Sequence, residues 1–397
     1  MAKKLQKRYI MRIFALGGAG KICRESALDI VRFGTFDQLT IGDNNINSAQ
    51  ETARWLNHPN VDFAFINVKN KKESIALLSD YDIVIDGTTI TLNALSTECI
   101  ALANCHGVNL NGFGEEYQFN DIFKLNGKIM VPGFGMTPGT TNMMAVYACD
   151  QMEKVNSVRV SHGAYRPIAF SGSITETTIY EYDPNLPGRT VFENGQFIQV
   201  PPFARPRVVQ LPQPFGKTLQ YIIPHSETFT LAKYLENKGV ELIEVRGTWP
   251  RENMLLIKAL YNYGFMNNQQ ISLNGHEFGI MDAIGEYLQK SAKGKTTELF
   301  GYSLHIEVEG IKNGQLVRQT LTHTHPASDG FDAEWAGLRA YTRNVGIPMS
   351  IAAQLIAQGK YKGEGALYPE FVFDPKTVFD ELAKRQIYIH TNEELIN

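Results

Sequence analysis

The chain has 397 residues, which is enough for two domains of ordinary size. Hydrophobic residues make up 43% of the sequence, charged residues make up 20%, and the formal net charge is −3. This balance is typical of a soluble globular protein and gives no electrostatic reason to expect nucleic acid or an anionic membrane as a partner. No apolar run approaches the roughly 20 residues that cross a bilayer. Arg12 interrupts the apolar stretch after the basic start, so we expect a strand there and not a signal peptide.

The sequence contains four cysteines, and none of them belongs to a Cys-x-x-Cys pair. They are too few for a disulfide scaffold in a chain of this length. We therefore expect reduced thiols and a cytoplasmic protein. The four are Cys23, Cys99, Cys105 and Cys149.

Strand and helix patterns alternate in the N-terminal part of the chain. Buried-strand patterns cover residues 11–16, 38–41, 61–68, 82–86 and 107–110, and helical patterns follow the first four of them at 23–31, 48–56, 74–78 and 93–104. Strands that alternate with helices at this spacing form a parallel sheet with helices on both faces. The sequence therefore predicts an α/β fold with a Rossmann-type, doubly wound parallel sheet.

The alternation ends near residue 150. Strand-like runs at 157–160, 220–223 and 303–308, with hairpin signals at Asn194-Gly195 and Asn313-Gly314, predict an inserted α+β domain with an antiparallel sheet. Prolines cluster between 184 and 214, which indicates a long irregular loop. Helical patterns at 346–358 and near 378–384 complete the chain.

The run Gly18-Ala19-Gly20-Lys21-Ile22-Cys23 follows the first predicted strand and opens the first predicted helix. It fits the dinucleotide-binding pattern G-x-G-x-x-(small). The first glycine permits a tight turn, the second lets the backbone approach a pyrophosphate, and the third position needs a small residue for helix–strand packing. Cys23 occupies that third position, where the pattern usually has glycine or alanine. A P-loop is excluded because Ile22 follows Gly20-Lys21.

Asp43 stands twenty residues after Cys23, at the end of the second predicted strand. A carboxylate there accepts hydrogen bonds from ribose hydroxyls and repels a 2′-phosphate, so the sequence predicts NAD and disfavours NADP. The alternative is a doubly wound fold that has lost its ligand. Because ligands bind beyond the carboxyl ends of such strands, the predicted cofactor contacts are Gly18, Ala19, Gly20, Lys21, Ile22, Asp43, Asn44, Val68, Gly87, Thr88, Thr89, Asn111 and Gly112.

Five segments together carry a family resemblance: the first turn, the run 131–143 (VPGFGMTPGTTNM), the stretches 339–342 and 352–359, and Tyr368-Pro369-Glu370. They resemble the saccharopine dehydrogenase-like family, and within it the L-lysine 6-dehydrogenases most, with saccharopine reductases and carboxynorspermidine dehydrogenases as related branches. The resemblance implies a dinucleotide-binding domain (1–145), a substrate and dimerisation domain (146–340) and a C-terminal segment that returns to the first domain (341–397). It also implies hydride transfer at a carbon–nitrogen bond of an amino acid or imine, and a homodimer.

Two arginines carry over from the family pattern, Arg166 in the run Ala-Tyr-Arg-Pro and Arg246 in Glu-Val-Arg. A guanidinium pairs bidentately with a carboxylate, so both are predicted to bind substrate. Salt bridges unrelated to substrate are the alternative. The Gly-Thr-Trp-Pro run after Arg246, where relatives more often carry a Gly-His pair, departs from the family pattern.

Proton transfer needs a group that titrates near neutral pH, which points to histidine. His225 is the first candidate, and His162 and Tyr165 are its competitors. Further predicted substrate contacts are Glu227, Thr228 and Tyr117. For Tyr117 and the two glutamates before it, the alternative is a solvated loop that does not contact substrate.

His323 and His325 could be two metal ligands on one strand, but no third ligand is identifiable and hydride transfer needs no metal. We therefore predict an NAD-dependent oxidoreductase without a metal. An imine reductase that prefers NADPH is the second hypothesis. A non-catalytic NAD-binding regulator is the third, and it predicts cofactor binding without turnover of any amine.

Overall fold

The computed structural model describes residues 11–185, 188–267, 269–325 and 333–396. The predicted basic lead-in, residues 1–10, lies outside the described residues. The chain divides into two compact units, one made of residues 1–135 and 346–373 and the other of residues 136–345 and 374–397. No helix in these described ranges is both long and apolar enough to span a membrane. The domain bounds that the sequence predicts, at 145/146 and 340/341, stay a prediction.

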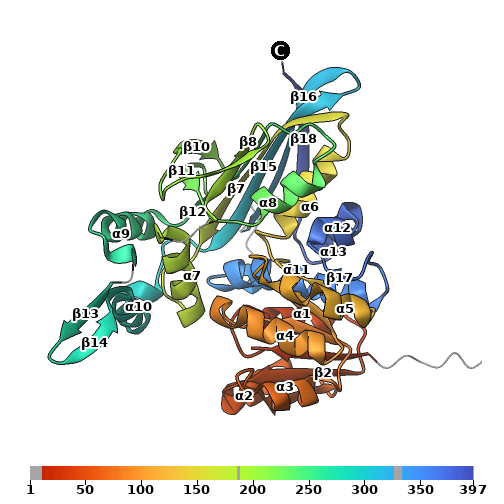
Figure 1. Cartoon of the computed structure of the whole chain (residues 1–397), viewed down its shortest axis with the longest axis vertical. Helices are drawn as coiled ribbons and strands as arrows, with labels where there is room; N and C mark the ends of the chain where they lie inside the picture. Colours follow the sequence, from red (N-terminus) through yellow and green to blue (C-terminus); the bar gives the residue numbers. More distant parts are fainter. Residues whose placement is uncertain (1–10, 186–187, 268, 326–332, 397) are drawn as a thin grey trace, which may run out of the picture. The chain divides into compact units, whose positions relative to one another are not determined.

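The first unit contains a seven-stranded sheet, and every strand pair in it is parallel. In spatial order its strands are β17 (Gly365–Ala366), β6 (Ile129–Val131), β5 (His106–Asn109), β4 (Ile83–Asp86), β1 (Arg12–Leu16), β2 (Gln38–Asp43) and β3 (Val61–Phe65). The strands lie between helices (Figure 1), which are α1 (Cys23–Phe33), α2 (Ile46–Leu56), α3 (Lys71–Leu78), α4 (Asn93–Leu102), α5 (Asn120–Leu125) and α12 (Pro369–Val372). The predicted Rossmann-type sheet is confirmed.

The later half of helix α11 (Arg339–Ala357) belongs to the first unit, where it packs on α1. The Ser26 hydroxyl donates to the Gly346 carbonyl at 2.6 Å, and Asp29 accepts from Ser350 at 2.7 Å. A Cβ at Gly346 would lie 2.7 Å from the Ile22 carbonyl oxygen, so glycine permits this close approach. The helix begins seven residues before the predicted start, because Pro348 inside it hides the periodicity of its first turns.

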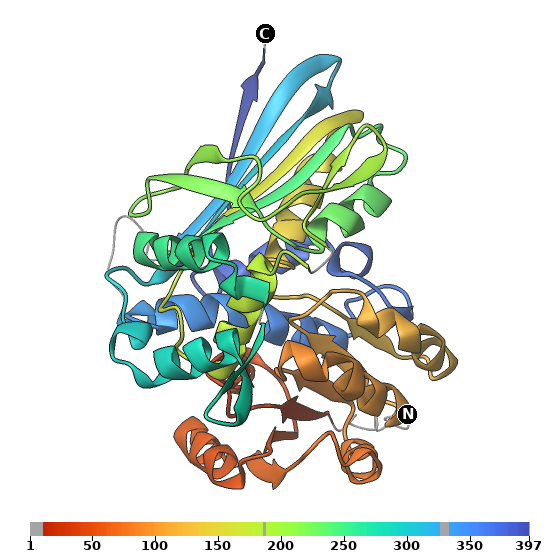
Figure 2. The same ribbon diagram turned by 60° about the vertical axis from the view of Figure 1, so that its left-hand side comes forward.

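The second unit contains a nine-stranded sheet. Its main path is β10 (Arg207–Gln210), β11 (Lys217–Ile222), β12 (Leu242–Thr248), β7 (Lys154–Tyr165), β15 (Gly301–Lys312), β16 (Gln315–His325) and β18 (His390–Leu395), and β8 (Thr190–Glu193) joins β12 and β9 (Gln196–Gln199). The long β15–β16 hairpin runs beside β7 in Figure 2, where these strands are blue and yellow. Both predicted hairpin turns, at Asn194-Gly195 and Asn313-Gly314, are confirmed.

Two details of this sheet correct the sequence-based expectations. The sheet is mixed, not antiparallel throughout, because β12 pairs with β7 in parallel. The stretch 184–214 is not one irregular loop, since it contains β8, β9 and β10. The described prolines of this stretch lie outside the three strands, where no ladder hydrogen bond is lost. Pro184 precedes β8, Pro201, Pro202 and Pro206 stand between β9 and β10, and Pro212 and Pro214 follow β10.

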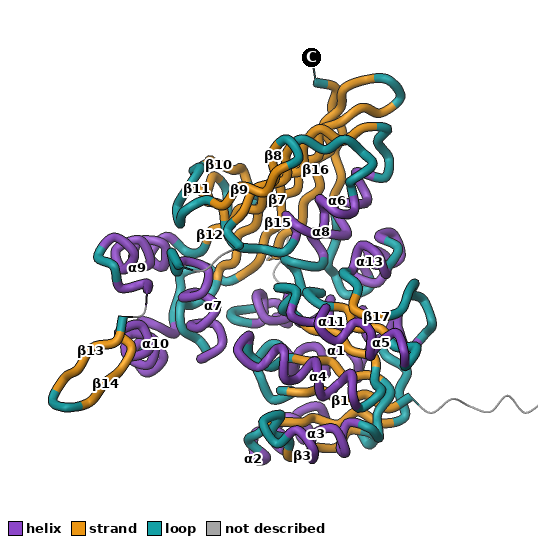
Figure 3. The backbone as a smooth tube through the Cα atoms, in the orientation of Figure 1, coloured by secondary structure: helices purple, strands orange, loops and turns teal. Residues whose placement is uncertain are grey.

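The helices of the second unit are α6 (Thr140–Cys149), α7 (Gly172–Tyr182), α8 (Glu227–Tyr234), α9 (Arg251–Asn262), α10 (Ile280–Lys290) and α13 (Pro375–Ala383). A small hairpin of β13 (Gln270–Leu273) and β14 (His276–Gly279) stands apart from the large sheet, next to α10 (Figure 3). The sequence analysis missed this hairpin, although its Asn274-Gly275 turn is a hairpin signal.

Candidate functional site

The glycine-rich turn after β1 has a backbone path that only glycine can follow. Gly17 has φ +66°, and the Gly18 N–H donates to the Gly42 carbonyl at 3.0 Å. A Cβ at Gly18 would lie 2.6 Å from the Ala15 carbonyl oxygen. Gly20 is exposed at the tip of the turn. The turn therefore presents bare backbone to an incoming ligand, directly before the N-terminus of α1.

Cys23, at the imperfect third position of the pattern, is accommodated by a glycine on another strand. Its side chain is 1% exposed, and a Cβ added at Gly87 would lie 2.6 Å from the Cys23 Cβ. Gly87, just after β4, supplies the space that a glycine or alanine at position 23 usually provides. Burial raises the pKa of the Cys23 thiol, so the thiol stays protonated and acts as a small apolar group.

Asp43 ends β2, as predicted. Its Oδ1 accepts from the Asn45 N–H at 3.0 Å, and Asn45 in turn caps α2 by accepting from the Ser48 N–H at 3.2 Å. These bonds fix the carboxylate at the carboxyl end of the sheet. Asn44 is exposed beside it.

A buried polar network fixes the loops after β4 and β5. Asp86, whose pKa is raised by burial, accepts from the Ser96 hydroxyl at 2.5 Å and from the Thr88 N–H at 2.9 Å. The Asn109 side-chain amide donates to Glu116 Oε1 at 2.9 Å, and the Gly112 N–H donates to the same oxygen at 3.3 Å.

The burial of Asp86, Asn93 and Asn109 in this network was not predicted from the sequence. Glu116 was considered as a loop acid that faces substrate or solvent, but it is fully buried in the network. Asp86 gave a signal, since it is a polar residue that ends an otherwise apolar strand.

The described residues of the first unit fit a dinucleotide. Gly20 is exposed, and a Cβ added there would meet the Gly17 carbonyl oxygen and no other described atom within 4 Å, so the turn leaves room for a pyrophosphate at this glycine. Asp43 offers two acceptor oxygens for ribose hydroxyls. Every predicted cofactor contact lies in the first unit, Asp43 at the end of β2 and the others in the turns or loops that follow β1, β2, β3, β4 and β5.

The second unit contains a buried ion pair between His225 and Glu227 at the start of α8. His225 Nδ1 lies 3.4 Å from Glu227 Oε2, which is an ion-pair distance longer than an ordinary hydrogen bond. The other carboxylate oxygen accepts from the hydroxyls of Thr137 at 2.7 Å and Thr141 at 2.8 Å. The chain brings these threonines, from the start of α6, to a carboxylate almost ninety residues later.

The two charges of the pair stabilise each other. Burial alone disfavours ionised Glu227, but His225 and the Thr137 hydroxyl outweigh burial and lower the pKa of Glu227 to about 2. Burial also disfavours protonated His225, yet the Glu227 charge raises the pKa of the imidazole overall. Because Nδ1 faces acceptor oxygens, it keeps its proton in both states, and Nε2 is the nitrogen that exchanges a proton.

His162 on β7 lies against His225, with ring centroids 5.6 Å apart. Burial lowers the pKa of His162 to about 3, and neither ring nitrogen has a hydrogen-bond partner among the described residues. A Cβ at Gly247 would lie 2.5 Å from His162 Nε2, so glycine at the paired position of β12 makes room for the ring. His162 is thus a neutral imidazole with unused polar atoms.

Two buried arginines belong to the same part of the second unit. Arg166 donates to the Pro167 carbonyl and to the Thr178 hydroxyl, both at 3.3 Å, and its charge acts on His162. The Arg189 guanidinium donates to the Glu181 carbonyl. Arg189 and Glu181 have no counterpart among the residues predicted from the sequence.

The structure brings His225, His162, Glu227 and Arg166 into one buried cluster and leaves other predicted residues outside it. Tyr165 packs its ring on Phe215, with centroids 4.5 Å apart. The Thr228 hydroxyl donates to the Thr190 carbonyl at 3.3 Å. Tyr117 belongs to the first unit, where it packs on Tyr368.

Arg246 pairs with Glu244, two residues earlier on β12, at 2.8 Å. Alternate residues of a strand share one face, so Arg246 and Glu244 lie on the face opposite Gly247 and His162. Arg246 therefore has an internal counter-charge, whereas no described carboxylate pairs with Arg166 at such a distance.

His323 and His325, which were considered as metal ligands, both make contacts with other side chains of the chain. His323 Nε2 lies 2.9 Å from Asn344 Oδ1, and His325 stacks on Trp335 with ring centroids 3.8 Å apart. Within the described ranges, no group of three or more His, Cys, Asp or Glu side chains is placed to hold a metal ion.

Comparisons with known proteins agree with this geometry. Residues 13–128 match the saccharopine dehydrogenase NADP binding domain, and residues 135–387 match the saccharopine dehydrogenase C-terminal domain. Carboxyaminopropylagmatine dehydrogenase from Synechocystis is 20% identical over 396 residues, 96% of each chain. Apo saccharopine dehydrogenase (L-Glu forming) from Saccharomyces cerevisiae has a similar fold, with a TM-score of 0.69, 15% identity and coverage of 98% of this chain and 100% of that one.

The parallel sheet, the glycine turn and the matched binding domain define an oxidoreductase that uses a nicotinamide dinucleotide. The chain belongs to the saccharopine dehydrogenase family. The family resemblance read from the sequence is thereby confirmed.

Proposed function

We propose that this protein is an NAD-dependent dehydrogenase that acts on a carbon–nitrogen bond of an amino acid, with lysine or a lysine-like amine as substrate. The observation that carries the proposal is the buried His225–Glu227 pair, a proton-exchanging imidazole oriented by a carboxylate. Oxidation of an amine to an imine releases a proton from nitrogen, and such a pair can accept it.

NAD would be held by the turn at Gly18–Gly20 and by Asp43, and when bound it supplies a hydride acceptor. The Asp43 carboxylate supports NAD because it would repel the 2′-phosphate of NADP. The matched family domain is an NADP binding domain, so the preference for NAD over NADP belongs to the proposal and does not follow from family membership.

We assign the substrate carboxylate to Arg166. This guanidinium is buried, and its Nε has no hydrogen-bond partner among the described residues. A buried donor without a partner is costly, and a carboxylate ligand would satisfy it. Arg246 is already neutralised by Glu244, which favours a structural role for it.

The residues around His225 then have separate tasks. Thr137 and Thr141 hold Glu227 by one oxygen, Glu227 holds the Nδ1 side of His225, and Nε2 exchanges the substrate proton. His162 stays neutral and lines the cluster as a polar, uncharged ring. A neutral neighbour avoids a second positive charge beside protonated His225.

The proposal extends to assembly and location. We propose a homodimer, as the family resemblance implies, which light scattering of the purified protein would test. A cytoplasmic location is supported by the four buried cysteines, all of which have free thiols.

A direct test follows the absorbance of reduced cofactor while the protein is mixed with NAD or NADP and a panel of amino acids and polyamines. Turnover of lysine with NAD is expected. His225→Gln should bind NAD normally and lose turnover, and His276→Gln, an exposed histidine on β14, is the matched control. Cofactor binding without turnover on any amine would favour a non-catalytic regulator.

A reductase for a larger imine is the second candidate. Its support is the relative named carboxyaminopropylagmatine dehydrogenase, which covers 96% of this chain. This candidate predicts oxidation of carboxyaminopropylagmatine, with NADP preferred, and little turnover of free lysine.

A further inference from the structure

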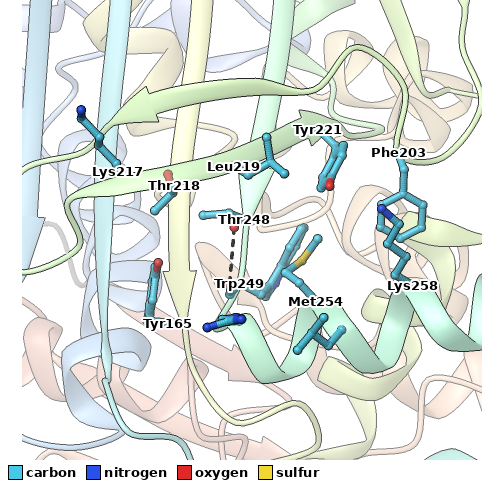
Figure 4. A pocket seen from close by; sticks show the side chains of 12 residues that line it. Tyr165, Phe203, Lys217, Thr218, Leu219, Tyr221, Thr248, Trp249, Met254 and Lys258 are labelled. Carbon is cyan, nitrogen blue, oxygen red and sulfur yellow. Dashed lines mark hydrogen bonds between the residues drawn. The ribbon is translucent and has the colours of Figure 1, made fainter.

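The second unit contains a pocket of about 430 Å³ that lies between β11 and one face of α9 (Figure 4). On α9 the lining residues recur at helical spacing and are Arg251, Met254, Leu255 and Lys258. On β11, Lys217, Leu219 and Tyr221 alternate and share one face of the strand, and Thr218 between them also lines the pocket. A volume of this size suits a small organic ligand.

The floor of the pocket is aromatic. Its rings come from Tyr165, Phe203, Tyr221 and Trp249. Phe203 and Tyr221 pack edge to face with centroids 5.2 Å apart. The Trp249 indole is 3% exposed, and its Nε1 has no hydrogen-bond partner among the described residues. The floor thus offers flat apolar surfaces on which a ring can pack.

Three cations surround this floor: Lys217, Arg251 and Lys258. None of the three forms an ion pair with a carboxylate of the described residues. The Lys258 ammonium instead lies over two rings of the floor, 5.8 Å from the Phe203 centroid and 5.9 Å from the Tyr221 centroid. The positive charge of the pocket therefore has no internal partner, which favours an anionic ligand.

We propose that this pocket binds a small organic anion with a flat ring, such as an aromatic carboxylate. The ring would lie on the aromatic floor, and the carboxylate would face the cations of the rim. Tyr165 adds a donor, because burial raises the pKa of its hydroxyl and keeps it protonated. The proposal does not depend on the proposed dehydrogenase activity, and its test measures binding alone.

The test is calorimetric titration of the purified full chain with 2-naphthoate, and with 2-naphthylmethanol as the uncharged probe of the same shape. We expect 2-naphthoate to bind saturably at one site per chain and the alcohol to bind at least about fivefold more weakly. Lys258→Met keeps the hydrocarbon on the rings and removes the charge, so it should weaken 2-naphthoate about fivefold and leave the alcohol unchanged.

Arg251→Gln should have the same effect as Lys258→Met, because both cations lie on one face of α9. The matched control is Lys376→Met, an exposed lysine on α13 of the same unit, which should bind 2-naphthoate as the wild type does. Equal binding of the two probes, or 2-naphthoate binding that neither α9 variant alters, would overturn the proposal.

Discussion

Glu227 and His225 allow a quantitative prediction about stability and pH. The pKa of Glu227 falls from an ordinary value of 4.5 to about 2 in the folded protein. A difference of this size corresponds to about 3 kcal/mol of folding free energy. Because the folded pKa is depressed, this stabilisation is fully present above pH 4.5 and is lost as the pH falls toward about 2.

His225 adds nothing to the pH dependence in that window. Its folded pKa is raised, so below its ordinary value of 6.5 it is protonated in both the folded and the unfolded states. The double variant His225→Gln/Glu227→Gln removes both titrating groups. Between about pH 4.5 and about pH 3, its free energy of unfolding should fall more slowly than that of the wild type, by about 1 kcal/mol per pH unit.

The assay is urea unfolding at several pH values, followed by tryptophan fluorescence, since Trp249 and Trp335 both belong to the second unit. Glu51→Gln, which changes an exposed carboxylate on α2, is the control and should keep the wild-type pH dependence. Parallel stability curves for the wild type and the double variant would refute the ion-pair reasoning.

Three further predictions concern single positions. Asp43→Ala should weaken NAD about tenfold and NADP much less, measured by cofactor titration, and an unchanged preference would remove Asp43 from the ribose site. Gly87→Ala should lower stability by about 1–3 kcal/mol because its Cβ meets Cys23, and Cys23→Gly in the same chain should restore most of the loss in thermal unfolding. Arg246→Gln should cost about 2 kcal/mol in urea unfolding, because it removes the charge-assisted hydrogen bonds to Glu244 and leaves that carboxylate with the more distant Arg159 at 3.7 Å and Arg207 at 3.9 Å; full stability would contradict that pairing.

The glycine turn and the acid at the end of β2 could be placed from the sequence because they are local features. A strand, a glycine turn, a helix and an acid at a fixed spacing are contiguous in the chain, and Asp43 lies where the pattern predicts. The packing of Cys23 could not be predicted, because its partner Gly87 follows a different strand, β4, more than sixty residues later.

The second unit was harder to predict because its contacts join distant segments. Thr137 and Thr141 reach Glu227 only once α6 and α8 are in place. By contrast, the pairing of Arg246 could have been read from the sequence, since Glu244 precedes it by two residues on a strand and must share its face. The parallel pairing of β12 with β7 depends on long connections, about which strand patterns carry no information.

Transfer of deuterium tests the central claim most directly. The protein is incubated with NAD and L-lysine deuterated at the ε-carbon, and the reduced cofactor is analysed by mass spectrometry. Direct hydride transfer at the carbon–nitrogen bond predicts reduced cofactor that carries one deuterium from the substrate. Failure to reduce NAD with any amine of the panel, or reduced cofactor without deuterium, would contradict the account.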